Sequence, residues 1–284
     1  MKLEQIAVID GAQDGAVWGN ELFRFDSEGV CKVYDITSLK GEVKPKASFT
    51  LSGVIPHSNS VCFGAEKYSA EDEYPILYSN IYNNYHKDPV DKLMGTVMAY
   101  RLKRDGGTYS AEAVGAIKIG FCEDARLWKA SEDEHGKRPY GNFVIDRENN
   151  ELYAFVMRNE ELGTRYFKFA MPRVGEGSFD ERLGVSCVVL SEGDIISSFD
   201  CSYHYFLQGA CFYGGRIYST EGFGGRDTKN RPAIRIVDPI KREERYYDLV
   251  EAGANVEPEL IDFYDGRCIY SDSHGNVYQI DFEA

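Results

Sequence analysis

Polar side chains that could bind a ligand or move a proton begin five separate segments of this sequence. They are carboxylates, carboxamides and one imidazole: Gln13, Asp14, His57, Asn59, Asn142, Gln208, Glu257 and Glu259. Carboxylates and imidazoles carry protons in acid–base chemistry, and amides form hydrogen bonds with sugars and peptide groups. An apolar or aromatic run follows each set, so we expect the starts of five strands to position these side chains as ligand-binding residues.

Glu259 and His57 are the best candidates for catalysis. A carboxylate that faces amides and an imidazole could act as a general acid or base if burial raises its pKa, and Glu257 precedes Glu259 by two positions. His57 is the only histidine on an expected inner strand, so we expect it to carry a proton or contact a ligand. The alternative is structural: the glutamates are solvated turn anions, and the amides satisfy backbone groups and water.

Motifs for a dedicated metal or nucleotide site are missing. The sequence has no HExxH, no paired Cys/His spacing, no Asp-rich calcium loop, no GxSxG and no P-loop. We therefore predict no transition-metal site and leave the cofactor unknown. One alternative stays open, a hard cation on the axis of the fold, bound by Glu257, Glu259, Asn59, Asn142 and Asp14.

A short unit recurs along the chain and indicates how these side chains are positioned. The segments 13–23 and 208–218 each combine a glutamine, a turn glycine and a strand aromatic at the same offsets, and 260–270 repeats the glycine and the aromatic. Such self-similarity is typical of repeat architectures. We interpret the unit as the inner strand, tight turn and second strand of a β-propeller blade.

The pattern of the whole chain favours an all-β fold, because helical periodicity is almost absent and 13% of the residues are aromatic. We predict one domain, residues 1–284, with five blades, and keep six blades as the alternative. The expected blades are 13–51, 57–119, 142–190, 208–249 and 259–282. Residues 185–190 are the expected fourth strand of blade three, 122–140 a charged connector, and residues 2–9 the strand that completes blade five.

In a propeller the first strand of each blade lines the central axis, and ligands commonly bind at one mouth of that channel. The eight polar side chains should therefore converge there. Aromatic residues near strand ends could stack on a sugar or a peptide side chain, although core packing is their commoner role: Tyr82, Tyr203, Tyr205, Phe206 and Phe223. His204 is placed on a loop at the mouth, with packing among aromatics as its alternative.

Residues 206–225, Phe-Leu-Gln-Gly followed by Gly-Gly-Arg-Ile-Tyr-Ser-Thr-Glu-Gly, resemble a signature of the plant- and bacterial-type glutaminyl cyclotransferases. The resemblance implies a five-bladed propeller and extends over roughly 206–282. In that family the next blade opens with Gly-Glu-Gly, whose glutamate is catalytic. The resemblance places this role on Glu259, although Pro258 and Leu260 stand where the family has glycines. A glutamate at a blade start is also similar to the metal-binding glutamate of gluconolactonase-like propellers.

Charge and cysteine usage limit the partners and the compartment. The net charge of −14 repels phosphate backbones, so we expect no nucleic-acid partner. No run of 18 apolar residues exists and the first residues lack a signal-peptide pattern, which predicts a soluble cytoplasmic protein without membrane contact. An export signal upstream of the first residue stays an alternative. We expect the seven scattered cysteines to be reduced, buried thiols.

These observations lead to three hypotheses. The first is a propeller that binds a small polar ligand, a sugar or a peptide end, at the mouth of the channel. The second is an enzyme at that mouth, a cyclotransferase, lactonase or glycan-active hydrolase or lyase, with Glu259 as general acid/base. The third is a scaffold that binds protein partners on a blade face and uses the channel only structurally. The sequence indicates no protein partner and no oligomeric state.

Overall fold

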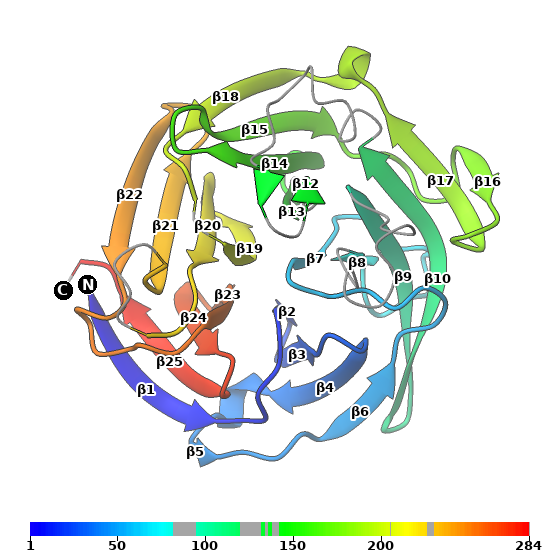
Figure 1. Ribbon diagram of the computed structural model, residues 1–284. Helices are drawn as coiled ribbons and strands as arrows, with labels where there is room; N and C mark the ends of the chain where they lie inside the picture. Colours follow the sequence, from blue (N-terminus) through cyan, green and yellow to red (C-terminus); the bar gives the residue numbers. More distant parts are fainter. Residues whose placement is uncertain are drawn as a thin grey trace.

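Five β-sheets are arranged around one axis, as the ribbon in Figure 1 shows. The computed structural model describes residues 1–81, 95–119, 132–133, 136–137, 142–204, 206–225 and 230–283. The strands nearest the axis are β2, β7, β13, β19 and β23, one from each sheet (Figure 1). The prediction of an all-β, five-bladed propeller is confirmed.

Three of the blades are four-stranded antiparallel sheets. Blade one contains β2 (Gly15–Trp18), β3 (Glu21–Phe25), β4 (Val30–Asp35) and β6 (Ala47–Thr50). Blade three contains β13 (Asn142–Asp146), β14 (Glu151–Asn159), β15 (Gly163–Ala170) and β18 (Ser197–Cys201). Blade four contains β19 (Leu207–Tyr213), β20 (Arg216–Glu221), β21 (Ala233–Asp238) and β22 (Glu243–Asp248).

The other two blades are larger. Blade two contains β7 (Val61–Phe63), β8 (Leu77–Asn80), β9 (Thr96–Asp105), β10 (Thr108–Ile119), β17 (Val185–Leu190) and β16 (Ser178–Asp180). Blade five contains β23 (Pro258–Tyr264), β24 (Arg267–Asp272), β25 (Asn276–Asp281), β1 (Lys2–Val8) and β5 (Gly41–Glu42). Two short 3-10 helices, η1 (Ile36–Ser38) and η2 (Glu192–Asp194), lie in connections.

The N-terminal strand completes blade five, as predicted. Strand β1 pairs antiparallel with β25, from Lys2 opposite Asp281 to Val8 opposite Asn276. The two chain ends consequently lie next to each other (Figure 1). A feature that the sequence did not indicate is β5, which adds in parallel to the outer edge of β1. Joining the first and last strands of the chain in one sheet is what closes the ring.

The predicted fourth strand of blade three was wrong. Residues 185–190 form β17, which pairs in parallel with β10 at the outer edge of blade two. Blade three is completed by β18, antiparallel to β15. The reason lies in packing: Cys187 is buried in the core between blades one and two, whereas Phe199 of β18 stacks on Tyr166 with ring centroids 4.9 Å apart. Both runs have a strand pattern, and only these tertiary contacts distinguish them.

The repeated turn glycines behave as the unit predicts. Gly214 and Gly215 both have positive φ and join β19 to β20 through a two-residue loop. Asp265 and Gly266 do the same between β23 and β24. Positive φ at both loop residues matches the right-handed twist of the flanking strands and favours glycine or aspartate there.

Apolar side chains fill the spaces between neighbouring blades. One buried cluster lies between blades one and two, one spans blades two to four, one lies between blades four and five, and one between blades five and one. The loop 83–94, most of the connector 122–140 with Trp128, and the aromatics Tyr82 and Tyr205 lie outside the described residues. Within the connector, β11 (Glu132–Asp133) and β12 (Gly136–Lys137) pair with each other. Across the described ranges, no helix is long and apolar enough to cross a membrane.

Candidate functional site at the mouth of the propeller

The starts of the inner strands lie against one another at one end of the axis, which we call the mouth. Backbone and side-chain bonds link them in turn: Asp14 N donates to Ser58 O (3.1 Å), and Ser60 Oγ donates to Phe143 O (2.6 Å). Asn142 Nδ2 then donates to Gln208 O (3.3 Å). The predicted site residues therefore come from all five blades and lie on or just before these strand starts. Asp14, Asn59, Asn142, Gln208 and Glu259 are buried, and Gln13, His57 and Glu257 are half-buried.

Two glutamine–glutamate pairs connect blade five to both of its neighbours. Gln13 of blade one donates from Nε2 to Glu259 Oε1 (3.3 Å), and Gln208 of blade four donates from Nε2 to Glu257 Oε1 (2.7 Å). We call these the mouth pairs. Each amide uses one of its two N–H groups on a carboxylate, so one N–H, the amide oxygen and the second carboxylate oxygen are the groups left for a ligand. Most of these groups are hydrogen-bond acceptors.

Glu259 is nearly inaccessible, with 1% of its surface exposed, and occupies a bulge in β23 between the pairs Pro258–Asp272 and Leu260–Ser271. Its Oε2 has no hydrogen-bond partner. Burial raises the pKa of Glu259 well above its ordinary value, and repulsion by Glu257 adds to the rise. Burial also raises the pKa of Glu257, and the hydrogen bond from Gln208 opposes this rise. A raised pKa keeps a carboxyl group protonated to a higher pH than an exposed carboxyl group.

Arg24 is a part of the site that the polar strand starts did not reveal. The side chain is 1% exposed, and its Nη2 donates to Ala12 O (3.2 Å), Ser271 Oγ (3.4 Å) and Asp272 O (3.0 Å). It thus lies behind the β23 bulge, and its charge opposes the rise in the pKa of Glu259. A signal was present: Arg24 interrupts the apolar run of β3 between Phe23 and Phe25.

Asp14 lies below the mouth pairs and links blades one and two. Its Oδ2 accepts from Val61 N (2.9 Å), while Oδ1 has no hydrogen-bond partner and lies against Gly209. A side chain at Gly209 would place its Cβ 2.5 Å from Asp14 Oδ1 and 1.9 Å from Glu259 O. Three inner strands therefore approach so closely that only glycine fits. Burial raises the pKa of Asp14 well above its ordinary value.

Asn59, Asn142 and His57 have different environments. Asn59 Oδ1 accepts from Asn80 Nδ2 (2.6 Å), and Asn80 Oδ1 accepts from Ser60 N (3.1 Å), so Asn59 belongs to a network inside blade two. Asn142 keeps Oδ1 without a partner. His57 precedes Ser58, whose carbonyl accepts from Asp14, and this contact places the histidine beside blade one at the mouth.

Carboxylates at the mouth do not form a metal centre of the usual kind. Among the described residues, no group of three or more His, Cys, Asp or Glu side chains is arranged to hold a metal ion. Of the five residues considered for a hard cation, Glu257 accepts from an amide, whereas Asp14 Oδ1, Asn142 Oδ1 and Glu259 Oε2 have no hydrogen-bond partner. A cation on the axis stays an alternative.

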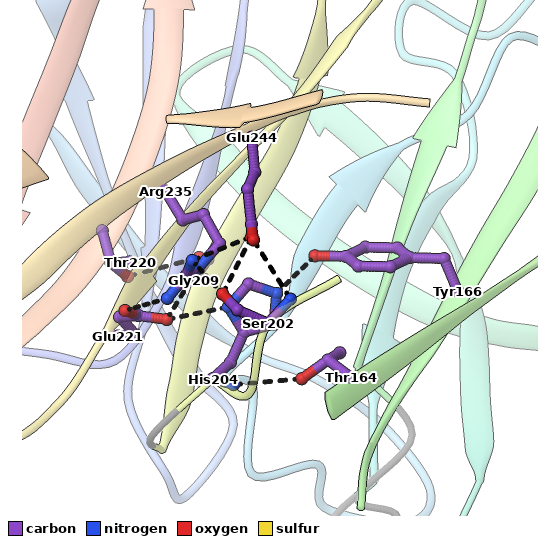
Figure 2. A network of polar contacts seen from close by, with 9 residues as sticks. All are labelled: Thr164, Tyr166, Ser202, His204, Gly209, Thr220, Glu221, Arg235 and Glu244. Atoms are coloured by element: carbon purple, nitrogen blue, oxygen red, sulfur yellow. Dashed lines mark hydrogen bonds and ion pairs between the residues drawn. The ribbon is translucent and has the colours of Figure 1, made fainter. Parts of the chain in front are cut away.

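His204 does not face the mouth but lies in a buried polar network beside it, between blades three and four (Figure 2). Its Nε2 lies 2.8 Å from Tyr166 Oη, and its Nδ1 lies 2.8 Å from Glu221 Oε2. Glu221 also forms an ion pair of 2.9 Å with Arg235. Packing beside an aromatic was one expectation for His204, and the ring of Tyr166 lies at 86° to it. The sequence did not indicate the ion pair of Glu221 with Arg235 or the bonds of His204, because these residues are up to 69 positions apart in the sequence.

Two phenylalanines form the rim next to the Gln208–Glu257 pair. The rings of Phe206 and Phe223 are 4.2 Å apart, and 38% of Phe223 is exposed. Phe206 has φ of 51°, a left-handed conformation that is unusual for a bulky residue. Such strain is retained where surrounding contacts enforce it, and the bond from Gly222 N to Phe206 O (2.9 Å) is one of them.

The opposite end of the axis is built differently. A depression of about 710 Å³ lies among the hairpin turns there and is lined by residues that include Trp18, Asn20, Arg147 and Tyr264. The guanidinium of Arg147 from blade three lies 5.4 Å from the centre of the Trp18 ring of blade one. The lining of this end combines aromatic rings with one cation, Arg147, and one anion, Asp265, whereas the mouth contains carboxylates and amides.

Comparisons with known proteins identify no family for this chain. No family model and no curated protein matches the chain. Solved structures that match include a computationally designed protein, Ika8 (11% identity, 97% of this chain and 99% of that chain, TM-score 0.36), and BamB from Moraxella catarrhalis (13%, 94% and 71%, TM-score 0.33). Glutaminyl cyclase from Myxococcus xanthus matches over 98% of both chains with 9% identity and a TM-score of 0.49. Similarity to the glutaminyl cyclases is therefore weak, and the chain is a five-bladed β-propeller whose function has to be argued from its own residues.

Proposed function

We propose that this propeller binds a small polar ligand, a sugar or a peptide end, at the mouth. The observation that carries the proposal is the pair of glutamine–glutamate bonds, Gln13–Glu259 and Gln208–Glu257. Each bond occupies one of the two N–H donors of an amide and leaves its oxygen and the second carboxylate oxygen as acceptors, and buried Glu259 Oε2 has no partner at all. A buried acceptor without a partner costs free energy, which a donor supplied by a ligand recovers.

The chemistry of the mouth favours a ligand with several hydrogen-bond donors. Hydroxyl groups of a sugar and the amino end of a peptide both satisfy this requirement, whereas an anionic ligand faces repulsion from Glu257 and Glu259. The phenylalanine rim adds an apolar surface on which a sugar face or an aromatic side chain can stack. Amphipathic small molecules bind best where a few oriented polar groups stand beside such a surface.

The alternative is an enzyme that uses Glu259 as general acid/base. Its burial, its unpartnered Oε2 and its raised pKa support this alternative, because a carboxyl group with a raised pKa holds a proton to higher pH and can donate it to a substrate. The positive charge of Arg24, which lies behind β23, would stabilise the ionised form of Glu259. Classes consistent with this chemistry are a cyclotransferase, a lactonase and a glycan-active hydrolase or lyase.

One set of experiments separates these functions. Glucosamine, glucose and glycylglycine are titrated by calorimetry into the wild-type protein, the Glu259→Gln variant and a Gln13→Ala, Gln208→Ala double variant. Binding by the wild type that weakens at least tenfold in the double variant supports the proposal. Turnover that Glu259→Gln abolishes without lowering the melting temperature supports the enzyme. Binding by none of the probes contradicts the proposal and leaves the scaffold hypothesis.

A further inference from the structure

An unbroken chain of buried polar groups connects blades three and four. The ring of His204 lies between the hydroxyl of Tyr166 on β15 and the carboxylate of Glu221 on β20, at 2.8 Å from each (Figure 2). Neither His204 nor Tyr166 is exposed, and Glu221 is 2% exposed. Without access for a substrate, this network has a positional role.

The ion pair of Glu221 with Arg235 determines where the proton on His204 lies. Glu221 accepts from Arg235 Nη2 (2.9 Å) and Nε (3.3 Å), so it is a carboxylate and can only accept from His204. The proton of the imidazole is therefore on Nδ1. The Nε2 atom then offers a lone pair, and the Tyr166 hydroxyl donates to it. In this neutral tautomer every polar atom of the ring has a partner.

A second proton would reverse one bond of this arrangement. With a proton on Nε2, Tyr166 Oη has to accept from the ring, so the hydroxyl has to turn its own hydrogen away from His204. The charged groups around the ring are Glu221, Arg235 and Glu244 from blade four, and blade three contributes the weak acids Tyr166 and Cys201. Burial lowers the pKa of His204, with Arg235 adding to the effect, while the hydrogen bond to Glu221 opposes it.

The network is joined directly to the mouth. Leu207, the residue before Gln208, pairs with Glu221 in the β19–β20 ladder. On the other side of Glu221, Gly222 N donates to Phe206 O (2.9 Å) and Gly225 N donates to Asn255 O (2.7 Å). Asn255 lies two residues before Glu257. One connection therefore leads from Glu221 through its partner Leu207 to Gln208. The other leads from Gly225 through Asn255 to Glu257.

We propose that Tyr166, His204 and Glu221 form a latch that positions Gln208 against Glu257, and that the latch rearranges when His204 gains a proton. His204 is a positioning residue, since it touches no ligand and acts through the backbone between Phe206 and Gln208. The importance of the latch for binding rests on the proposed function of the mouth. The latch itself is defined without any ligand.

The test uses nuclear magnetic resonance on the full chain without ligand. Long-range proton–nitrogen spectra of His204 should show the Nδ1–H tautomer at pH 8. On acidification, the backbone amide of Gly222, which donates to Phe206, should move together with protonation of His204. In Tyr166→Phe the ring loses this hydroxyl in both protonation states, so both transitions should shift from their wild-type pH by the same amount.

A second variant keeps the proposal testable if Tyr166→Phe does not fold. His204→Asn retains a donor for Glu221 but cannot titrate, so the acid transition of Gly222 should disappear while the circular dichroism spectrum is unchanged. The matched change His274→Asn, on an exposed turn, should leave the transition in place. An Nε2–H tautomer in the wild type, or an unchanged Gly222 transition in His204→Asn, overturns the latch. Because no ligand is added, these results are independent of whether the mouth binds a sugar or peptide.

Discussion

Gln208 and Glu257 join blades four and five through one hydrogen bond of 2.7 Å at the point where both inner strands begin. The matching bond from Gln13 to Glu259 joins blades one and five. Blade five thus contributes both carboxylates, and each neighbouring blade contributes an amide that orients one of them. This arrangement depends on closure of the ring, because Gln13 and Glu259 are 246 positions apart in the sequence.

Replacing Glu259 by Gln should stabilise the protein at alkaline pH. The pKa of Glu259 is raised in the folded state, so folding costs free energy once the pH exceeds the ordinary value, and the cost grows until the pH passes the folded pKa. Each unit of displacement corresponds to about 1.4 kcal/mol, so we expect a gain on the order of 1 kcal/mol or more at pH 8. At pH 4.5 the gain should largely vanish. Urea unfolding at both pH values measures it.

The control for that experiment is Glu148→Gln, which makes the same chemical change on an exposed turn. It should alter the free energy of unfolding by less than about 0.5 kcal/mol at either pH. A Glu259→Gln variant that is less stable than the wild type at pH 8 would show that its carboxylate is stabilised in the fold.

Replacing Arg24 by Met should destabilise the protein strongly. The change removes the Arg24 donor from the backbone carbonyls of Ala12 and Asp272 and removes the cation that opposes the charges of Glu259 and Asp14. Loss of one member of such a buried group costs about 3–5 kcal/mol. Because the carboxylates ionise as the pH rises, the loss should be larger at pH 8 than at pH 5.

A double-mutant cycle tests whether Arg24 acts on Glu259. In the Glu259→Gln background, Arg24→Met should cost less than in the wild type, by on the order of 1 kcal/mol. The free energies of unfolding are measured with urea. If the effects of the two single changes add up in the double variant, the two side chains do not interact.

Replacing Gly209 by Ala should disturb the mouth and the fold together. The new methyl group would lie 1.9 Å from Glu259 O, so strands of blades four and five have to move apart. Overpacking of this kind costs about 1–3 kcal/mol. Thermal unfolding measures the loss, and Gly107→Ala is the control, because a Cβ there has no atom within 4 Å. Equal melting temperatures for the two variants would contradict the close approach of the inner strands.

The sequence predicted the fold well because its signals are local. Turn glycines such as Gly214 and Gly266 recur with the same spacing, and the short strands around them show the period of a sheet. Assigning Val185–Leu190 to blade three failed because its largely apolar run is a stronger strand signal than Ser-Ser-Phe-Asp-Cys of Ser197–Cys201. The burial of Cys187 between blades one and two places Val185–Leu190 in blade two. This is a tertiary contact, so the local pattern of the sequence does not show it.

The candidate site was predictable in part for the same reason. Polar residues at strand starts are visible in the sequence, and the ring geometry then brings Gln13 and Glu259 together. Arg24 is different, because its function depends on the carbonyls of Ala12 and Asp272, which only the closed ring places beside it. The partners of His204 likewise come from two blades, so its sequence neighbours could not reveal them.

The most direct test of the account observes the mouth itself. The sequence contains four glutamines, Gln5, Gln13, Gln208 and Gln279, so their side-chain amides can be assigned individually by substitution. During titration of nitrogen-15-labelled protein with glucosamine, and separately with glycylglycine, the account predicts saturable shifts of Gln13 and Gln208 with at least one probe. Gln5, which pairs with Asn276 on the outside, should not move. Shifts confined to Trp18 at the opposite end of the axis, or no saturable shift with either probe, would contradict the account.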